Sequence, residues 1–220
     1  MLAGLCLPVI SGQKKSELKL PEQYRLWLEE EVVYIITSKE GDVFRKLETD
    51  KERDIFIEAF WKHRDPTPGT PRNEFKDEHY QRRKYANEYF SRGTPKPGWM
   101  TDMGRIYIIL GPPRNSEDHD TISGVYPVRI WSYEGDPNYG FPTAFNIIFF
   151  KKHGVGEYVL YSPVDDGPES LIADWGTGLT DEYMRDSGRG TQSAILQLVP
   201  CVEIPLERVT EEEAKEFDLE

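Results

Sequence analysis

The sequence predicts an α+β fold in which an N-terminal helical segment packs on a mainly antiparallel β-sheet. The first part of the chain combines helix start signals with apolar residues at helical spacing. The second part consists of short aromatic runs separated by turn residues, at spacings that fit hairpins. Because the helices come first and the strands second, the order favours an α+β domain over alternating βαβ units.

The helical part is expected to begin near Pro21, since proline suits the first turn of a helix. Thr37 with Glu40, and Thr49 with Glu52, match the capping box, in which each side chain bonds the backbone N–H of the other residue. These two pairs predict the starts of a second and a third helix.

The third helix is expected to end near Arg64, because the proline at position 66 pushes the preceding residue toward extended geometry. A fourth and longer helix is expected over residues 73–92, with Gly93 as its C-cap. Each of these helices carries an apolar stripe. The stripe of the third helix is Ile55, Phe56, Ala59 and Phe60, and that of the fourth is Phe75, His79, Ala86 and Phe90.

Residues 98–113 connect the two parts and are predicted to form a loop that leads into a buried strand. Thr101 and Asp102 can accept hydrogen bonds from nearby backbone amides in such a loop. Residues 106–110 form a continuous apolar run, which is interpreted as the strand. The Gly-Pro-Pro sequence that follows is expected to end it, because proline has no backbone N–H.

The rest of the chain reads as a polar loop over residues 114–123 followed by short strands. The best hairpin signal is the pair of strand-like runs on either side of residues 153–156. The remaining expected elements are strands over 128–134, 143–152 and 157–162, a turn over 136–140, a short helix over 169–175, a strand over 195–204 and a helix from residue 210.

Four segments are expected along the chain. Residues 1–12 are apolar and uncharged before an abrupt change to Gln-Lys-Lys, which is typical of the end of a secretory signal peptide. They predict an exported protein of the periplasm or cell envelope; a frayed apolar N-terminus is the alternative. Residues 20–93 form the helical part, residues 94–205 the α+β core, and residues 206–220 an acidic C-terminal tail.

Composition excludes several classes of protein. The formal charge of −12 and the pI near 4.9 argue against nucleic acid as a partner, because no basic patch offsets the repulsion of phosphates. The only cysteines, Cys6 and Cys201, have neither zinc-site nor redox-motif spacing. No apolar run approaches the roughly 18–20 residues of a membrane span. We therefore expect no transmembrane span in the mature chain.

The motifs of known chemistry are weak here. Residues 63–65 read His-Arg-Asp, yet they lack the other parts of a kinase catalytic loop. Residues 117–120 offer four adjacent potential ligands without the spacing of a calcium loop, and are interpreted as a solvated acidic loop. His79 shares an apolar stripe and is interpreted as a packed core residue. Neither a metal nor a cofactor is expected.

The candidate site consists of Arg64, Asp65, Asp102, Arg105 and Trp99. The four charged residues lie where regular structure meets a constrained loop, so their charge-assisted hydrogen bonds are expected to hold those loops together. The functional interpretation is a rigid binding surface, with Trp99 as an exposed aromatic anchor and Arg105 meeting a carboxylate of the partner.

The sequence resembles the GWxTD-domain family of bacterial proteins. Its signature is matched by Gly-Trp-Met-Thr-Asp at residues 98–102. Residues 60–71, 73–75 and 104–113 also fit the family's pattern, and the likeness covers roughly residues 20–162. The resemblance implies exported or envelope-associated proteins of uncharacterised function, and it supplies no catalytic residues.

Two hypotheses of function follow. The leading one is a non-catalytic module of the bacterial cell envelope that binds a protein partner or a surface component, or serves as a subunit of a larger assembly. The alternative is a hydrolase-type enzyme with a carboxylate site near Asp65 and Asp102. Catalysis is the weaker hypothesis, because no spacing suggests a nucleophile paired with a base. Convergence of the two carboxylates in a deep pocket would favour the enzyme.

Overall fold

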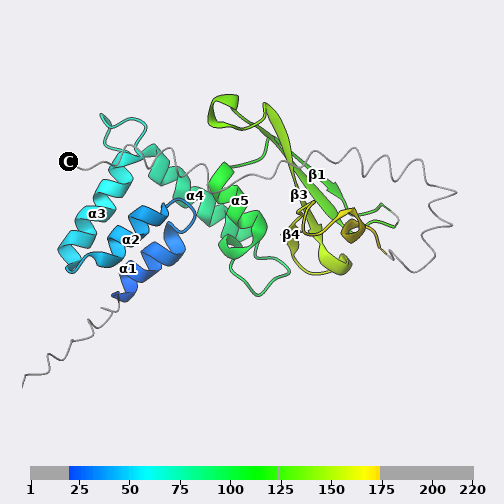
Figure 1. Cartoon of the computed structure of the whole chain (residues 1–220), viewed down its shortest axis with the longest axis horizontal. Helices are drawn as coiled ribbons and strands as arrows, with labels where there is room; N and C mark the ends of the chain where they lie inside the picture. The colour runs from blue at the N-terminus through cyan, green and yellow to red at the C-terminus, as the bar shows by residue number, and fades with distance from the viewer. Residues whose placement is uncertain (1–19, 123, 174–220) are drawn as a thin grey trace, which may run out of the picture. The chain divides into compact units, whose positions relative to one another are not determined.

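The computed structural model describes residues 20–122 and 124–173, and these residues form the predicted α+β fold. Within them lie five α-helices followed by a four-stranded antiparallel sheet (Figure 1). The chain divides into two compact units, Met1–Phe56 and Ile57–Glu220. The expected signal-peptide remnant, the strand over 195–204, the helix from residue 210 and the acidic tail lie outside the described residues.

Unit 1 is built from α1 (Glu22–Leu26), a π-helical turn (Trp27–Glu31), α2 (Ser38–Lys46) and the beginning of α3 (Asp50–His63). Both predicted capping boxes are confirmed. The Thr37 hydroxyl accepts from the Glu40 N–H at 3.2 Å, while the Glu40 carboxylate accepts from the Thr37 N–H at 2.8 Å. Thr49 and Glu52 make the same reciprocal pair before α3.

The core of unit 1 is aromatic and centres on Phe44, which is fully buried. Its ring centroid lies 4.9 Å from that of Trp27, 5.2 Å from that of Phe56 and 6.2 Å from that of Tyr24. The Phe44 side chain therefore connects α2 to α1, to the π-helical turn and to α3. Such contacts are individually small, but together they hold short helices that would not be stable alone.

The predicted apolar stripe of α3 is wrong in part, because Ile55 is 57% exposed. Arg53 is buried in its place. Its guanidinium donates to the carbonyl of Leu47 at 2.7 Å and pairs with Asp50 at 2.7 Å. Arginine can occupy this position because the carbonyl beyond the end of α2 and the nearby carboxylate accept from its two terminal nitrogens, whereas its Nε has no acceptor among the described residues.

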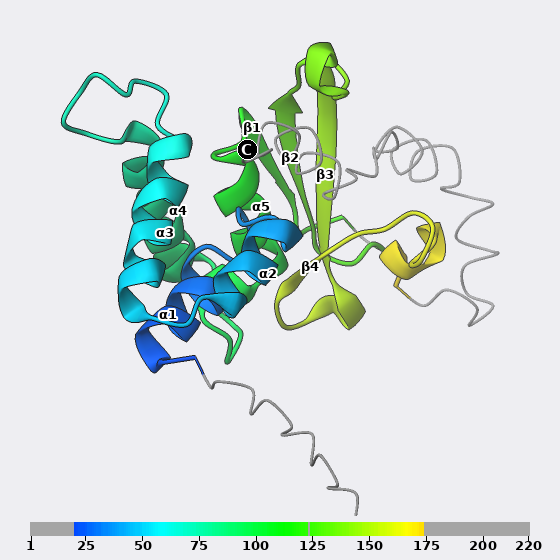
Figure 2. The same cartoon turned by 60° about the vertical axis from the view of Figure 1, so that its left-hand side comes forward.

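Unit 2 contains α4 (Glu74–Tyr89), a short 3₁₀ turn (Gly98–Met100) and α5 (Asp102–Leu110). The predicted fourth helix is confirmed, but it ends at Tyr89 with Phe90 and not Gly93 as its C-cap, and Phe75 of its expected stripe is exposed. The predicted strand over residues 106–110 is wrong, because these residues belong to α5. Figures 1 and 2 show α5 between α4 and the sheet.

Helix α5 forms despite its run of β-branched residues, because its start and its packing both favour a helix. The Thr101 hydroxyl accepts from the Gly104 N–H at 3.0 Å and caps the first turn. Met103 and Ile106 are buried on the sheet side, while Ile108 is buried elsewhere on the helix. A helix buried on more than one side reads as a continuous apolar run, which is also the pattern of a buried strand.

The sheet is a meander with strand order β1-β2-β3-β4. The strands expected over 128–134, 143–152 and 157–162 are confirmed, and so is the hairpin between the last two. The loop expected over 114–123 is wrong in part, because five of its residues form an edge strand that is polar throughout and therefore shows no apolar alternation. The strands are β1 (Asn115–His119), β2 (Val128–Glu134), β3 (Ala144–Lys151) and β4 (Tyr158–Leu160).

Both faces of the sheet are covered. Residues on one face pack against α5, and residues on the other pack against Tyr161 and Leu171 from the chain after β4. The first face holds Trp131, Tyr133, Phe145, Ile147 and Phe149; the second holds Val128, Ile130, Ile148 and Phe150. Leu171 ends the 3₁₀ turn Pro168–Leu171, the described part of the short helix expected over 169–175.

The expected turn over residues 136–140 is confirmed as the 3₁₀ turn Pro137–Tyr139, which Asp136 caps by accepting from the Asn138 N–H at 2.8 Å. No helix in residues 20–122 or 124–173 combines the length and the apolar character needed to cross a bilayer.

We expect Phe44→Ala to lower the free energy of unfolding by about 3–5 kcal/mol, because it leaves a cavity among the aromatic rings. Val43→Ala is the matched control. Val43 is the preceding residue in α2 and is 49% exposed, so its truncation is expected to change stability by less than about 0.5 kcal/mol. Urea unfolding of both variants measures the difference, and equal midpoints would contradict the central role of Phe44.

Candidate binding pocket

The Gly-Trp-Met-Thr-Asp sequence forms the corner where α4 meets α5. A Cβ added to Gly98 would lie 1.9 Å from the carbonyl oxygen of Ala86 in α4. A Cβ added to Gly104 would lie 1.9 Å from the carbonyl oxygen of Gly98. Only a glycine hydrogen fits at either place, so both positions require glycine for close approach of the backbone. The two helices are therefore closer at this corner than other residues would permit.

Trp99 is part of the corner and is 9% exposed, so the expectation of an exposed aromatic anchor is wrong. Its backbone N–H donates to Oδ1 of Asn87 at 3.0 Å. The Arg83 guanidinium lies 4.6 Å from the centroid of its ring, within reach of a cation–π interaction. Trp99 therefore connects the corner to two residues of α4.

Asp102 joins α5 to the outer edge of the sheet. Its Oδ2 accepts a hydrogen bond from the backbone N–H of Leu160 at 2.9 Å. That N–H points away from β3, because the next amide, of Tyr161, bonds the carbonyl of Ile148 in β3. The other carboxylate oxygen of Asp102 lies 3.2 Å from the guanidinium of Arg105, one turn further along the helix. The pair thus lies at a junction between elements, as the sequence predicts.

Arg64 and Asp65 lie at another junction. The Arg64 guanidinium donates to the carbonyl of Phe60 at 3.2 Å and lies 3.8 Å from the centroid of its ring. Asp65 accepts from the Thr67 N–H at 3.0 Å in the loop before α4. Figure 1 shows that this loop and the α4–α5 connection lie at opposite ends of α4, a helix of 16 residues. Asp65 and Asp102 are therefore not brought together.

A hollow of about 490 Å³ opens beside the corner. Such a volume lies in the range of roughly 300–1,000 Å³ that is usual for small-ligand sites. Aromatic and cationic side chains dominate its lining. The lining residues are Tyr85, Tyr89, Phe90, Arg92, Gly93, Thr101, Met103, Arg129, Lys151, Gly156, Glu157 and Tyr158.

On the side of the hollow that the sheet forms, two cationic side chains lie over the ring of Tyr158. The Arg129 guanidinium lies 4.8 Å and the Lys151 ammonium 5.0 Å from the centroid of its ring. Arg129 also pairs with Asp118, which raises the pKa of the guanidinium. The Tyr158 hydroxyl donates to Asp120 at 2.6 Å. Burial of the ring and this hydrogen bond both raise the pKa of Tyr158, so the phenol is neutral at physiological pH.

Glu157 contributes a carboxylate of which one oxygen accepts a hydrogen bond and the other does not. Its Oε1 accepts from the Lys96 ammonium at 2.7 Å, which raises the pKa of Lys96. Its Oε2 is buried and accepts no hydrogen bond within the described part of the chain. A buried carboxylate oxygen without a donor is costly in free energy, which makes Glu157 an unusual residue of the lining.

The helix wall is a stack of tyrosine rings. The Tyr85 ring lies 4.2 Å from that of Tyr89 and 4.5 Å from that of Tyr107, at interplanar angles of 23° and 12°. Tyr85 is 38% exposed and Tyr89 is 48% exposed. Tyr89 therefore ends the stack and presents an aromatic surface beside the hollow.

Sequence spacing does not indicate this set of residues, although the strand register contains a signal for it. Arg129 shares its sheet face with Trp131 and Tyr133, and Lys151 shares its face with Phe149. A cation in the alternation of a buried face is unusual and indicates a lined cavity or an internal pair.

Two of the acidic residues in segment 117–120 hold side chains that line the hollow. Asp118 and Asp120 bind Arg129 and Tyr158, and the described residues contain no cluster of three or more acidic, histidine or cysteine side chains placed to hold a metal ion. His79 is buried beside the ring of Trp61, with centroids 5.6 Å apart, which confirms its predicted core position.

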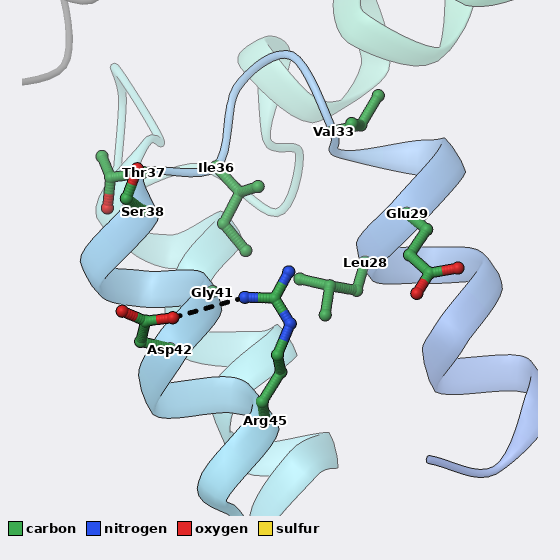
Figure 3. A pocket seen from close by; sticks show the side chains of 9 residues that line it. All are labelled: Leu28, Glu29, Val33, Ile36, Thr37, Ser38, Gly41, Asp42 and Arg45. Carbon is green, nitrogen blue, oxygen red and sulfur yellow. Dashed lines mark hydrogen bonds and ion pairs between the residues drawn. The ribbon is translucent and has the colours of Figure 1, made fainter. Parts of the chain in front are cut away.

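A second hollow, of about 520 Å³, lies within unit 1 between the π-helical turn and α2 (Figure 3). Leu28 and Ile36 point into it from two sides. The Arg45 guanidinium lies over Gly41 and bonds Asp42 at 3.4 Å. Both members of this pair are largely exposed, so the pair adds little fixed structure. The hollow of unit 2 is the more completely organised of the two.

The fold and the corner together define an α+β domain whose Gly-Trp-x-Thr-Asp sequence closes two helices on an antiparallel sheet. The chain belongs to the GWxTD domain family, whose model matches residues 19–154. No curated protein and no solved structure matches the chain.

We expect Gly98→Ala to lower the free energy of unfolding by about 3 kcal/mol or more, because the added methyl group overlaps the Ala86 carbonyl. Gly69→Ala is the matched control, since a Cβ there meets nothing within 4 Å. Its effect is expected to stay below about 1 kcal/mol. Urea unfolding compares the two, and a Gly98→Ala protein as stable as the wild type would refute the close approach.

Asp102→Ala is expected to cost about 1–3 kcal/mol, because the Leu160 N–H loses its acceptor. Asp102→Asn keeps an acceptor oxygen and should lie closer to the wild type. Hydrogen exchange gives a local readout: the Leu160 amide should exchange faster in the alanine variant. Unchanged exchange at Leu160 would show that the carboxylate does not hold the edge strand.

Proposed function

We propose that this protein is a non-catalytic module of the bacterial cell envelope that binds a protein partner or a surface component in the hollow of unit 2. The observation that carries the proposal is the hollow itself, in which cationic and aromatic side chains converge beside the corner of the family motif.

The charge of the hollow supports binding of an anionic group. Its lining contains the cations Arg92, Arg129 and Lys151 and one acidic residue, Glu157. The whole chain carries a formal charge of −12. A cationic site on an acidic protein focuses the local potential on one place, which favours an anionic ligand there and repels it elsewhere.

The lining is also ordered before any ligand arrives. Arg129 is held by Asp118, and Glu157 by Lys96. Tyr85 is stacked between two other tyrosines. Side chains that are already fixed lose little conformational entropy on binding, which raises affinity without adding contacts.

The chemistry of the lining supports binding more than turnover. Its twelve residues include no histidine, serine or cysteine. The one hydroxyl on an aliphatic side chain, that of Thr101, donates to the Gly98 carbonyl at 2.7 Å and accepts from the Gly104 N–H. It therefore lacks the adjacent base that would activate a nucleophile.

The envelope location rests on the sequence. The first twelve residues are apolar and uncharged and precede Lys14 and Lys15, as in the end of a secretory signal peptide. An exported module with an organised hollow also suits a subunit of a larger surface assembly.

The test is capture from solubilised envelope fractions on the immobilised full chain. We expect the wild type to retain a defined component and the double variant Tyr89→Ala, Lys151→Ala to lose it. Arg45→Ala is the matched control, because it removes an exposed cation from the hollow of unit 1. Retention of the same components by all three proteins, or by none, would refute binding at this hollow.

A further inference from the structure

We infer that the ligand of the hollow in unit 2 is an acidic polysaccharide, of which a uronate residue occupies the hollow. This inference rests on the proposed binding function and names the class of ligand. It is drawn from three features of the lining: an available cation, an exposed aromatic face and a buried acceptor.

The available cation is Lys151. Arg129 already forms an ion pair with Asp118. Lys151 forms no ion pair within the described part of the chain, and its ammonium lies over the ring of Tyr158. Arg92 on the opposite wall lies 5.8 Å from the centroid of the Tyr89 ring. A carboxylate that enters the hollow can pair with these two cations without breaking an existing pair.

The aromatic face belongs to Tyr89. It ends the stack of tyrosine rings and is 48% exposed. The Arg92 guanidinium lies 5.8 Å from the centroid of this ring, so a sugar that packs on the ring replaces that contact and leaves Arg92 to pair with the carboxylate. The face of an aromatic ring is electronegative and attracts groups of partial positive charge. The C–H groups on one side of a pyranose ring are such groups, and their flat array matches a ring face.

The buried acceptor is Oε2 of Glu157, which has no donor among the described residues and which a ligand hydroxyl reaches when the Glu157 side chain, 23% exposed, turns toward the hollow. Sugar hydroxyl groups are donors and lie within one ring's width of the carboxylate of a uronate. A single uronate residue therefore supplies a carboxylate for Lys151, a C–H face for Tyr89 and a hydroxyl for Glu157. An acidic peptide supplies the first of these in the same way but not the second.

The edge of the sheet also disfavours a peptide. An extended peptide commonly binds by adding a strand to a free edge. Strand β4, which contributes Tyr158 to the hollow, has its outward Leu160 N–H bonded to Asp102. Backbone pairing at this edge would require that bond to break, whereas a glycan does not need it.

Titration calorimetry with a short oligogalacturonate tests the inference on the full chain. We expect saturable binding that weakens as salt is added, because an ion pair contributes to it. Tyr89→Ala and Lys151→Ala should each weaken the affinity at least tenfold. Arg45→Ala should leave it unchanged. Thermal melting of each variant checks the fold, and chemical-shift changes at Tyr85 and Tyr158 locate the ligand without any substitution.

The other probes separate the outcomes. A neutral oligosaccharide of equal length should bind at least tenfold more weakly. Equal binding of the neutral sugar, tighter binding of an oligoglutamate, or absence of oligogalacturonate binding would each overturn the inference. Oligoglutamate binding that depends on Tyr89 and Lys151 would overturn the glycan while leaving the hollow as a binding site. Capture from envelope fractions, described above, tests the proposed binding function independently of the class of ligand.

Discussion

The contact between the Gly98 backbone and the Ala86 carbonyl is the constraint on which unit 2 depends. Two helices can approach this closely only where one of them, or the turn before it, carries no side chain. The same contact is repeated within the corner by Gly104 against Gly98, so the turn is fixed from both sides. Thr101 then caps α5 with a hydroxyl whose hydrogen bonds stay inside the corner. The glycines and the threonine of this sequence thus set the position of α5 against α4, while Asp102 joins α5 to β4.

The position of α5 determines the hollow. Thr101 and Met103 contribute to its lining from the helix, and Asp102 fixes the β4 strand whose neighbouring residues, Glu157 and Tyr158, form part of the opposite wall. The motif residues do not need to meet a ligand themselves in order to matter for binding. They hold the two walls at a set distance, and all the side chains that line the hollow except that of Thr101 lie outside the motif. This arrangement separates most of the residues that identify the family from those that line the hollow.

Much of the fold could be predicted from local signals, because capping boxes, prolines and hairpin turns act over a few residues. Two elements could not. Helix α5 is buried on more than one side, so its apolar pattern matches that of a buried strand, and only packing decides between them. Strand β1 is polar throughout, and its pairing with β2 provides the order that its own sequence does not indicate. The candidate residues Asp102 and Arg105 proved to lie at a junction, whereas Arg129, Lys151 and Tyr158 converge only through the register of three strands, which sequence spacing does not specify.

The two outer strands of the sheet differ from the aggregation-prone edges that flat sheets present. Strand β1 carries Glu117 and Asp118 along its length, and β4 is three residues long with its outward Leu160 amide already bonded. Charge on one edge and a short, occupied strand on the other both hinder the stacking of copies into a continuous ribbon. Association of copies of this domain through the edges of its sheet is therefore disfavoured.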